Sequence, residues 1–267
     1  MTNWLSTLLL GVVQGIAEFL PVSSSGHLVI IQALLKRYAG YDLPDPVQLN
    51  IVLHAGTLLS ILVVYRARIL RLLGPDREVI PKLIVGTLPA VAIGLPLHEM
   101  DSLQWLLTDP LLAGAMLPLT GLLLIVGNRL GTGQTDYTAM SYRQALSIGL
   151  FQAVAILPGI SRSGATIVGG LLVGLRRDAA ATFSFFLAII AICGAIVLEL
   201  RKFATEGVGD QGLTLMVGAA VSFVVGMFAL RLLLRWLNEG RLHWFAAWCI
   251  PVGLLVVAWQ VAIRFGS

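Results

Sequence analysis

Charged residues are scarce in this chain. Of its 267 residues, 12% are Asp, Glu, Lys or Arg, whereas a soluble domain carries ~25%, so a soluble globular protein is not expected. The net charge of +4 is too small to indicate a nucleic-acid-binding protein. There are only two cysteines, Cys193 and Cys249, and each lies alone in an apolar run. Without metal-ligand spacing, both are expected to pack rather than to bind a metal.

Apolar residues make up 57% of the chain, and the mean hydropathy is +0.89. Apolar runs of spanning length recur from end to end, which predicts a polytopic helical membrane protein. The start, "MTNWLSTLLL", has no basic segment of the kind that precedes a cleavable signal. The first apolar run is therefore expected to remain in the mature protein.

Two apolar stretches are too long and too broken to be simple spans. Residues 4–35 as one helix would be about 48 Å long, against a hydrocarbon core of about 30 Å. This stretch breaks at residues 21–26, and the stretch 145–175 breaks at "PGISRSG", residues 158–164. Broken backbone at that depth is tolerated only inside protein or beside a wet cavity, so both stretches are predicted to be re-entrant helical hairpins.

Three ordinary spans follow each hairpin. They are expected near residues 47–64, 79–99, 111–127, 183–200, 213–234 and 244–264. The chain then reads as hairpin plus three transmembrane helices, twice, within one membrane domain over residues 1–267, with halves at about 1–130 and 140–267.

The two hairpins also match each other in sequence at an offset of 138. Gly11, Gln14, Ala17, Ser23, Ser25 and Gly26 match Gly149, Gln152, Ala155, Ser161, Ser163 and Gly164. An odd number of spans in each half forces opposite orientations, which predicts an all-α, inverted-topology repeat. Loops on one side carry twelve Lys and Arg and those on the other carry five. By the positive-inside rule both termini, and the mouth of the first hairpin, are extracytoplasmic.

Ionisable side chains inside a membrane are costly, and they are functional candidates for that reason. Glu18 and Gln14 are four residues apart on one helix face, and Arg162 is the basic residue of the second break. A Glu18–Arg162 pair that only locks the hairpins together is the structural alternative.

Each break places hydroxyls and free N–H groups at the start of a short helix, which suits an anion. The groups are Ser23, Ser24, Ser25 and Gly26 in the first break, and Ser161, Arg162, Ser163, Gly164 and the following Thr166 in the second. Arg162 adds a planar fork of donors matched to phosphate. Flexibility alone could also account for Gly and Ser at either break.

His27 lies close to these serines, where it could exchange a proton with a nucleophile. Glu18 could act as a base or hold a divalent metal bridged to phosphate oxygens. His54, in the next span, is a weaker candidate. These features predict a midplane site for a phosphorylated, lipid-linked substrate, without saying whether a bond is broken.

Two segments, "QGIAEFLPVSSSGH" (14–27) and "LPGISRSGAT" (157–166), resemble the signature segments of the undecaprenyl-pyrophosphate phosphatase family of the bacitracin-resistance type. The resemblance continues through "VLHAGTLLSILVVYR" (52–66) and "GGLLVGLRRDAAATFSFFLAI" (169–189). It implies removal of the terminal phosphate of undecaprenyl pyrophosphate, which regenerates the lipid carrier for cell-wall synthesis. It also implies a bacterial plasma-membrane location, a site on the periplasmic side and a divalent metal, Mg or Ca.

The resemblance implies that Glu18 binds a metal or acts as a base, with Gln14 beside it as a metal ligand. It also implies that Arg162 binds the pyrophosphate. It leaves Ser24 and His27 as alternative nucleophiles, and Ser24 is the preferred one. The hydroxyls and glycine of the two breaks (Ser23, Ser25, Gly26, Ser161, Ser163 and Thr166) are expected to bind substrate. Many relatives have a carboxylate at the position of Gln14, which weakens the metal assignment there.

A transporter or flippase of a phosphorylated lipid carrier is the alternative function, because inverted repeats with broken helices are transporter architecture. The concentration of hydroxyls with Glu18 and His27 favours an enzyme. The expected partners are the polyprenyl pyrophosphate lipid and the bilayer, without nucleic acid, and a homodimer is left open.

Overall fold

The computed structural model describes residues 4–39, 46–129, 133–206 and 212–265, and these residues are almost entirely helical. In chain order the helices are α1 (Trp4–Phe19), α2 (Ser24–Leu34), a π-helical turn (Leu35–Ala39), α3 (Pro46–Val64), α4 (Arg66–Leu72), α5 (Val79–Glu99), a 3-10 turn (Asp101–Leu103), α6 (Trp105–Thr108), α7 (Pro110–Arg129), α8 (Tyr142–Val154), α9 (Arg162–Leu172), α10 (Arg177–Glu206), α11 (Gly212–Asn238), a 3-10 turn (Leu242–Phe245) and α12 (Ala246–Phe265). One isolated bridge pairs Thr135 with Leu175.

Five of these helices are long and apolar enough to cross a membrane: α5, α7, α10, α11 and α12. A sixth candidate is α3 together with α4, which is bent from it by 79°. These six coincide with the six spans predicted from the sequence, so the multi-pass helical class is confirmed. The helix α10 begins at Arg177, earlier than the predicted residue 183, since Asp178 in its first turn complements the helix dipole and alanines follow.

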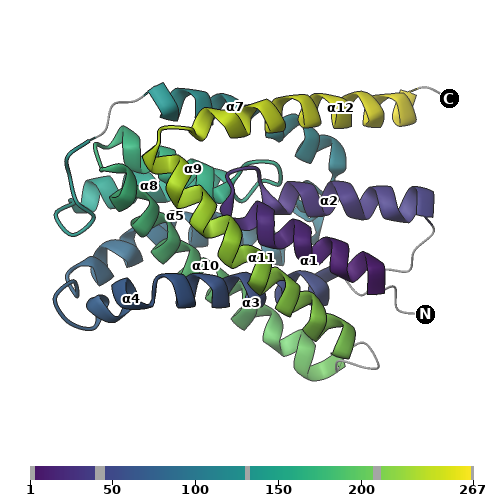
Figure 1. Ribbon diagram of the computed structural model, residues 1–267. Coiled ribbons are helices and arrows are strands. Elements are labelled where there is room, and N and C mark those ends of the chain that lie inside the picture. Colours follow the sequence, from purple (N-terminus) through teal and green to yellow (C-terminus); the bar gives the residue numbers. More distant parts are fainter. Residues whose placement is uncertain (1–3, 40–45, 130–132, 207–211, 266–267) are drawn as a thin grey trace.

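Both termini lie at one end of the molecule, and α4 lies at the opposite end (Figure 1). The end with α4 also carries Arg129 at the end of α7 and Arg235 at the end of α11. Basic residues of α4, α7 and α11, which the sequence assigns to one side of the membrane, therefore lie at this end.

The helix α10 forms the centre of the bundle. Its residues from Ala179 to Ala188 are all buried, and its aromatic side chains fill the main core. Phe185 contacts Phe19 of α1 edge-to-face, with ring centroids 5.9 Å apart, and lies 5.4 Å from the ring of Tyr65. The end of α1, which carries Glu18, is thereby fixed against α10.

The two halves of the chain contact each other reciprocally: α1 packs on α11, and α8 packs on α5. Glycine permits both contacts. A Cβ on Gly11 would lie 2.9 Å from the carbonyl oxygen of Gly218, and one on Gly149 would lie 2.4 Å from that of Gly86. Small residues at membrane helix interfaces let backbones approach closely. Gly11 and Gly149 are equivalent positions at the offset of 138, so equivalent glycines of the two hairpins make the same kind of helix contact.

Of the two cysteines, Cys249 is buried and Cys193 is exposed. The packing role expected from the sequence is confirmed for Cys249 only.

Candidate active site

Both predicted breaks are present, and both are capped in the same way. The first helix of each pair ends before the break, at Phe19 and at Val154. A proline follows in each case, and proline disfavours helical backbone at the residue before it. Ser23 then accepts a hydrogen bond from Gly26 N at 3.3 Å, and Ser161 accepts one from Gly164 N at 3.1 Å. Each serine is the N-cap of the next helix.

Matching contacts extend to the next hydroxyl in each break. Ser25 Oγ lies 3.4 Å from Ser23 Oγ, and Ser163 Oγ lies 3.1 Å from Ser161 Oγ. All four serines were predicted to bind substrate. Ser25 is the exposed member, whereas the other three are buried.

The two breaks meet through Ser23 and Gly159. Ser23 has φ of 72°, a left-handed conformation that is unusual for a serine. Its Oγ accepts a hydrogen bond from Gly159 N at 3.1 Å. A Cβ on Gly26 would lie 2.7 Å from the same nitrogen. Only a glycine at position 26 allows this approach. Gly26, which was predicted to bind substrate, therefore makes a close backbone contact between the breaks.

Thr120 of α7 holds the second break from the other side. Its Oγ1 donates to the carbonyl of Gly159 at 2.7 Å and accepts from Ser161 N at 3.0 Å. The sequence offered no sign of this role beyond a single hydroxyl in an apolar span.

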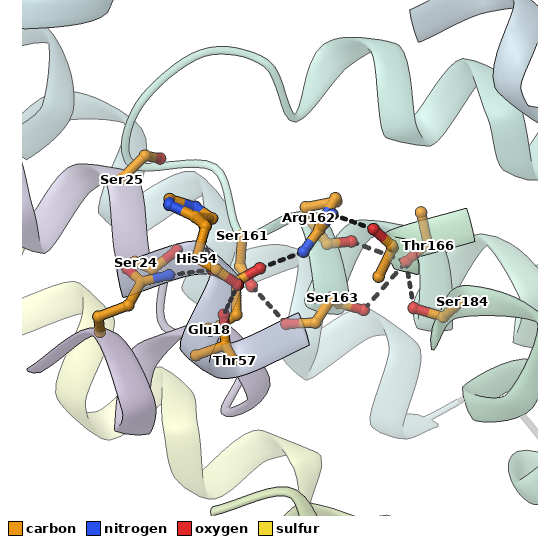
Figure 2. A network of polar contacts seen from close by, with 12 residues as sticks. Glu18, Ser24, Ser25, His54, Thr57, Ser161, Arg162, Ser163, Thr166 and Ser184 are labelled. Atoms are coloured by element: carbon orange, nitrogen blue, oxygen red, sulfur yellow. Dashed lines mark hydrogen bonds and ion pairs between the residues drawn. The ribbon is translucent and has the colours of Figure 1, made fainter. Parts of the chain in front are cut away.

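Glu18 lies at the centre of the site, and polar side chains of α1, α2, α3 and α9 surround its carboxylate (Figure 2). Arg162 forms an ion pair with Oε1. Ser24 Oγ donates to Oε2 at 2.7 Å, and Gln14 Nε2 donates to it at 2.9 Å. His54 Nε2 lies 3.5 Å from Oε2. The side chain of Glu18 is only 3% exposed, so its charge depends on these partners.

The predicted pairing of Glu18 with Arg162 is therefore present, and it joins α1 to α9. Arg162 also donates from Nη1 to the carbonyl of Ala188 in α10, at 3.4 Å. On the far side of Arg162, Thr166 bonds to Ser184 at 2.5 Å and donates to the carbonyl of Arg162 at 2.7 Å (Figure 2). Thr166, predicted to bind substrate, thus supports the first turn of α9.

The sequence indicates His54 only as a weaker candidate, yet its ring faces Glu18. Its Nδ1 donates to the carbonyl of Asn50 at 2.7 Å, which directs Nε2 toward the carboxylate. Thr57, one turn further along α3, is fully buried and donates to the carbonyl of His54. A histidine inside an apolar span was the sequence signal for this role. The packing of α3 against α1, however, cannot be inferred from the local sequence.

His27 is held differently. Its Nδ1 donates to the carbonyl of Ser23 at 2.8 Å, and its Nε2 accepts from Trp248 Nε1 at 2.9 Å. The two rings are stacked with centroids 6.2 Å apart. Both ring nitrogens are thus engaged with groups other than Ser24 and Glu18.

A small cavity of about 30 Å³ lies where the breaks converge, lined by Glu18, Ser24, Ser25, Ser161 and Arg162 among others. This volume holds about one water molecule. A diphosphate is larger than this space, so the two breaks must move apart for it to bind between them.

The bundle and this cavity define a class of protein. It is a multi-pass membrane protein with a buried site in which one carboxylate, one guanidinium and several hydroxyls gather at two helix N-termini. Such a site can bind an anion and transfer a proton.

Comparison with known proteins gives the family. Residues 7–255 match the family described as bacitracin resistance protein BacA, and the chain belongs to this family. A relative from Rhodopirellula baltica is 53% identical over 259 residues, covering 96% of this chain and 98% of the relative. Relatives from Carboxydothermus hydrogenoformans and Methanosphaera stadtmanae are 38% and 33% identical, each covering 98% of this chain and 100% of the relative. All three are named undecaprenyl-diphosphatase.

Proposed function

We propose that this protein is an undecaprenyl-diphosphatase, which hydrolyses the terminal phosphate of undecaprenyl diphosphate and so confers bacitracin resistance. The observation that carries the proposal is the convergence of Ser24, Glu18 and Arg162 from the two breaks. A hydroxyl in contact with a buried carboxylate, beside a guanidinium, suits phosphoryl transfer.

Ser24 is the proposed nucleophile and Glu18 its base. The hydroxyl already donates to Glu18 Oε2 at 2.7 Å, within reach for proton transfer. Ser24 Oγ attacks the terminal phosphorus, its proton passes to Glu18, and undecaprenyl phosphate leaves. Water then attacks the phosphoserine, inorganic phosphate is released, and Ser24 recovers its proton. The engagement of both His27 nitrogens elsewhere supports Ser24 over His27.

Arg162 is proposed to bind the diphosphate. Its guanidinium pairs with Glu18 in the closed arrangement, and its side chain is 22% exposed. An entering diphosphate offers the guanidinium more oxygens than one carboxylate does, in a geometry that favours bidentate bonds. The exchange of partners would free Glu18 to accept the proton of Ser24. Ser25 and Ser163 are proposed to bind the substrate once the two breaks have moved apart.

A divalent metal, Mg or Ca, is proposed at Glu18 and Gln14. The described residues contain no cluster of three His, Cys, Asp or Glu, but magnesium needs only one or two carboxylates when phosphate oxygens complete its shell. Gln14 is fully buried and its Oε1 has no hydrogen-bond partner. Its Nε2 faces Glu18 in this structure, so rotation of the amide would present Oε1 to a metal held by Glu18. Bound there, the metal would neutralise charge on the phosphate oxygens.

The finer topology is likewise a proposal: two inverted repeats, each a re-entrant hairpin followed by three spans. The matching N-caps, the matching glycine contacts and the reciprocal packing of α1 on α11 and α8 on α5 support it. With the basic end in the cytoplasm, the first hairpin opens toward the periplasmic side of the bacterial plasma membrane. A homodimer is left open.

The test is the fate of undecaprenyl diphosphate with purified protein in detergent. We expect one inorganic phosphate and one undecaprenyl phosphate per substrate in the presence of magnesium or calcium, and a large loss of rate with a chelator. Lipid movement across a vesicle without phosphate release would favour the flippase alternative and reject hydrolysis.

A further inference from the structure

A second cavity lies apart from the Glu18 site. It is a groove of about 570 Å³ between the last turns of α7 and the start of α12. Ile125, Ile250 and Pro251 form its apolar walls, and Asn128, Arg129 and His243 supply its polar groups. Asn128 Oδ1 is engaged, since it accepts a hydrogen bond from Leu242 N at 3.1 Å. No residue is shared with the cavity at Glu18. We refer to it as the α7–α12 groove.

The basic groups of the groove are unpaired. Among the described residues, neither Arg129 nor His243 has a hydrogen-bond or ion-pair partner. Several other arginines at this end are paired, as Arg71 is with Asp76. An unpaired guanidinium next to an apolar wall is suited to an amphiphile with an anionic group.

The groove opens at the level of lipid head groups. His243 is followed by Trp244, which is 53% exposed and lies beside Trp236, with ring centroids 5.6 Å apart. Arg241 lies over the ring of Trp244, 5.4 Å from its centroid. Exposed tryptophan with arginine is typical of the membrane–water interface. The end of the groove at His243 therefore faces head groups, and the end at Pro251 lies toward the acyl chains.

We propose that the α7–α12 groove binds an anionic phospholipid of the cytoplasmic leaflet. The phosphodiester contacts Arg129 and His243, and the start of one acyl chain follows Ile125 and Ile250. A single guanidinium matches the one negative charge of a phosphodiester, whereas a phosphomonoester carries up to two. The volume lies within the usual range of ~300–1,000 Å³ for ligand sites.

The groove is a site for binding and not for hydrolysis. Its lining includes no carboxylate and no hydroxyl, so it has neither a nucleophile nor a base of the kind that Ser24 and Glu18 supply. This lipid would stay bound to the protein without being hydrolysed, and it is distinct from the substrate.

The test measures retention of phosphatidylglycerol by purified protein in detergent, using native mass spectrometry, against phosphatidylcholine with the same acyl chains. We expect Arg129→Gln to weaken phosphatidylglycerol binding about tenfold or more, as loss of a charge-assisted hydrogen bond does, and to leave phosphatidylcholine unchanged. The matched control is Arg143→Gln. Arg143 is an exposed arginine at the same end, outside the groove, and likewise unpaired among the described residues. Its replacement should change binding less than twofold.

A second variant separates binding from stability, since Arg129 also lies in the last turn of α7 and complements its dipole. Ala247→Trp fills the groove without changing charge, and it should also weaken phosphatidylglycerol binding while phosphate release from undecaprenyl diphosphate continues. Wild-type retention in both variants overturns the proposal. An equal loss in Arg143→Gln overturns it too, because general surface charge would then explain the binding.

Discussion

Replacing Gly26 by alanine tests the contact between the two breaks. The added Cβ would lie 2.7 Å from Gly159 N and 2.8 Å from its Cα, where ordinary contacts begin at 3.4 Å. Both opposing atoms are backbone, so no side chain can turn away, and the breaks must separate by about 0.7 Å. Overpacking of this kind costs ~1–3 kcal/mol of stability. A displacement near 1 Å at reacting groups costs ~10²-fold in rate. We therefore expect kcat/KM to fall about a hundredfold.

The assay is phosphate release from undecaprenyl diphosphate in detergent, with thermal unfolding measured on the same preparation. Gly194→Ala is the matched control, because a Cβ there meets nothing within 4 Å and the position lies inside α10. That variant should keep wild-type activity and gain up to ~1 kcal/mol of stability. If Gly26→Ala kept half or more of the wild-type kcat/KM, the close approach of the breaks would not matter for catalysis.

Three further predictions concern other residues. Arg162→Lys should lose at least ~10²-fold in phosphate release, because lysine cannot replace a bidentate fork; recovery above a tenth of wild-type rate would refute this. Hydrogen bonding by Arg71 lowers the pKa of Asp76 below its ordinary value of 3.8. Asp76 therefore stabilises the fold above that pH, and the contribution is lost as pH falls through the lowered pKa. The melting temperature of wild type should thus fall below about pH 4, whereas that of Asp76→Asn should lack this step. Parallel curves of melting temperature against pH would contradict the reasoning. Leu73→Cys in a Cys193→Ala background should react with an impermeant thiol reagent only from the cytoplasmic side, and labelling from outside would reverse the proposed orientation.

The spans and the breaks could be predicted because each follows from local chemistry. A run of apolar residues has a length set by the bilayer, and Pro, Gly and Ser interrupt a helix wherever they occur together. The start of α2 at Ser24 and of α9 at Arg162 follows from the serine that caps each helix. The Glu18–Arg162 pair could be predicted because unpaired charges inside a membrane are costly.

The neighbours of these residues could not be predicted, since they depend on how helices pack. His54 reaches Glu18 only because α3 lies against α1, and Thr120 bonds the second break only because α7 lies against α9. Trp248 engages His27 from more than two hundred residues away. A single sequence gives no measure of such contacts, although each long-range partner is a polar or aromatic residue inside an apolar span.

The central claim is that Ser24 and Glu18 act together on the terminal phosphate. The most direct measurement compares release of inorganic phosphate from undecaprenyl diphosphate by wild type, Ser24→Ala and Glu18→Gln, with each protein shown to be folded by its melting curve. The account predicts release by wild type and a loss of at least ~10³-fold in both variants, because each removes one half of a single proton transfer. Release by folded Ser24→Ala at a rate near that of wild type would contradict it.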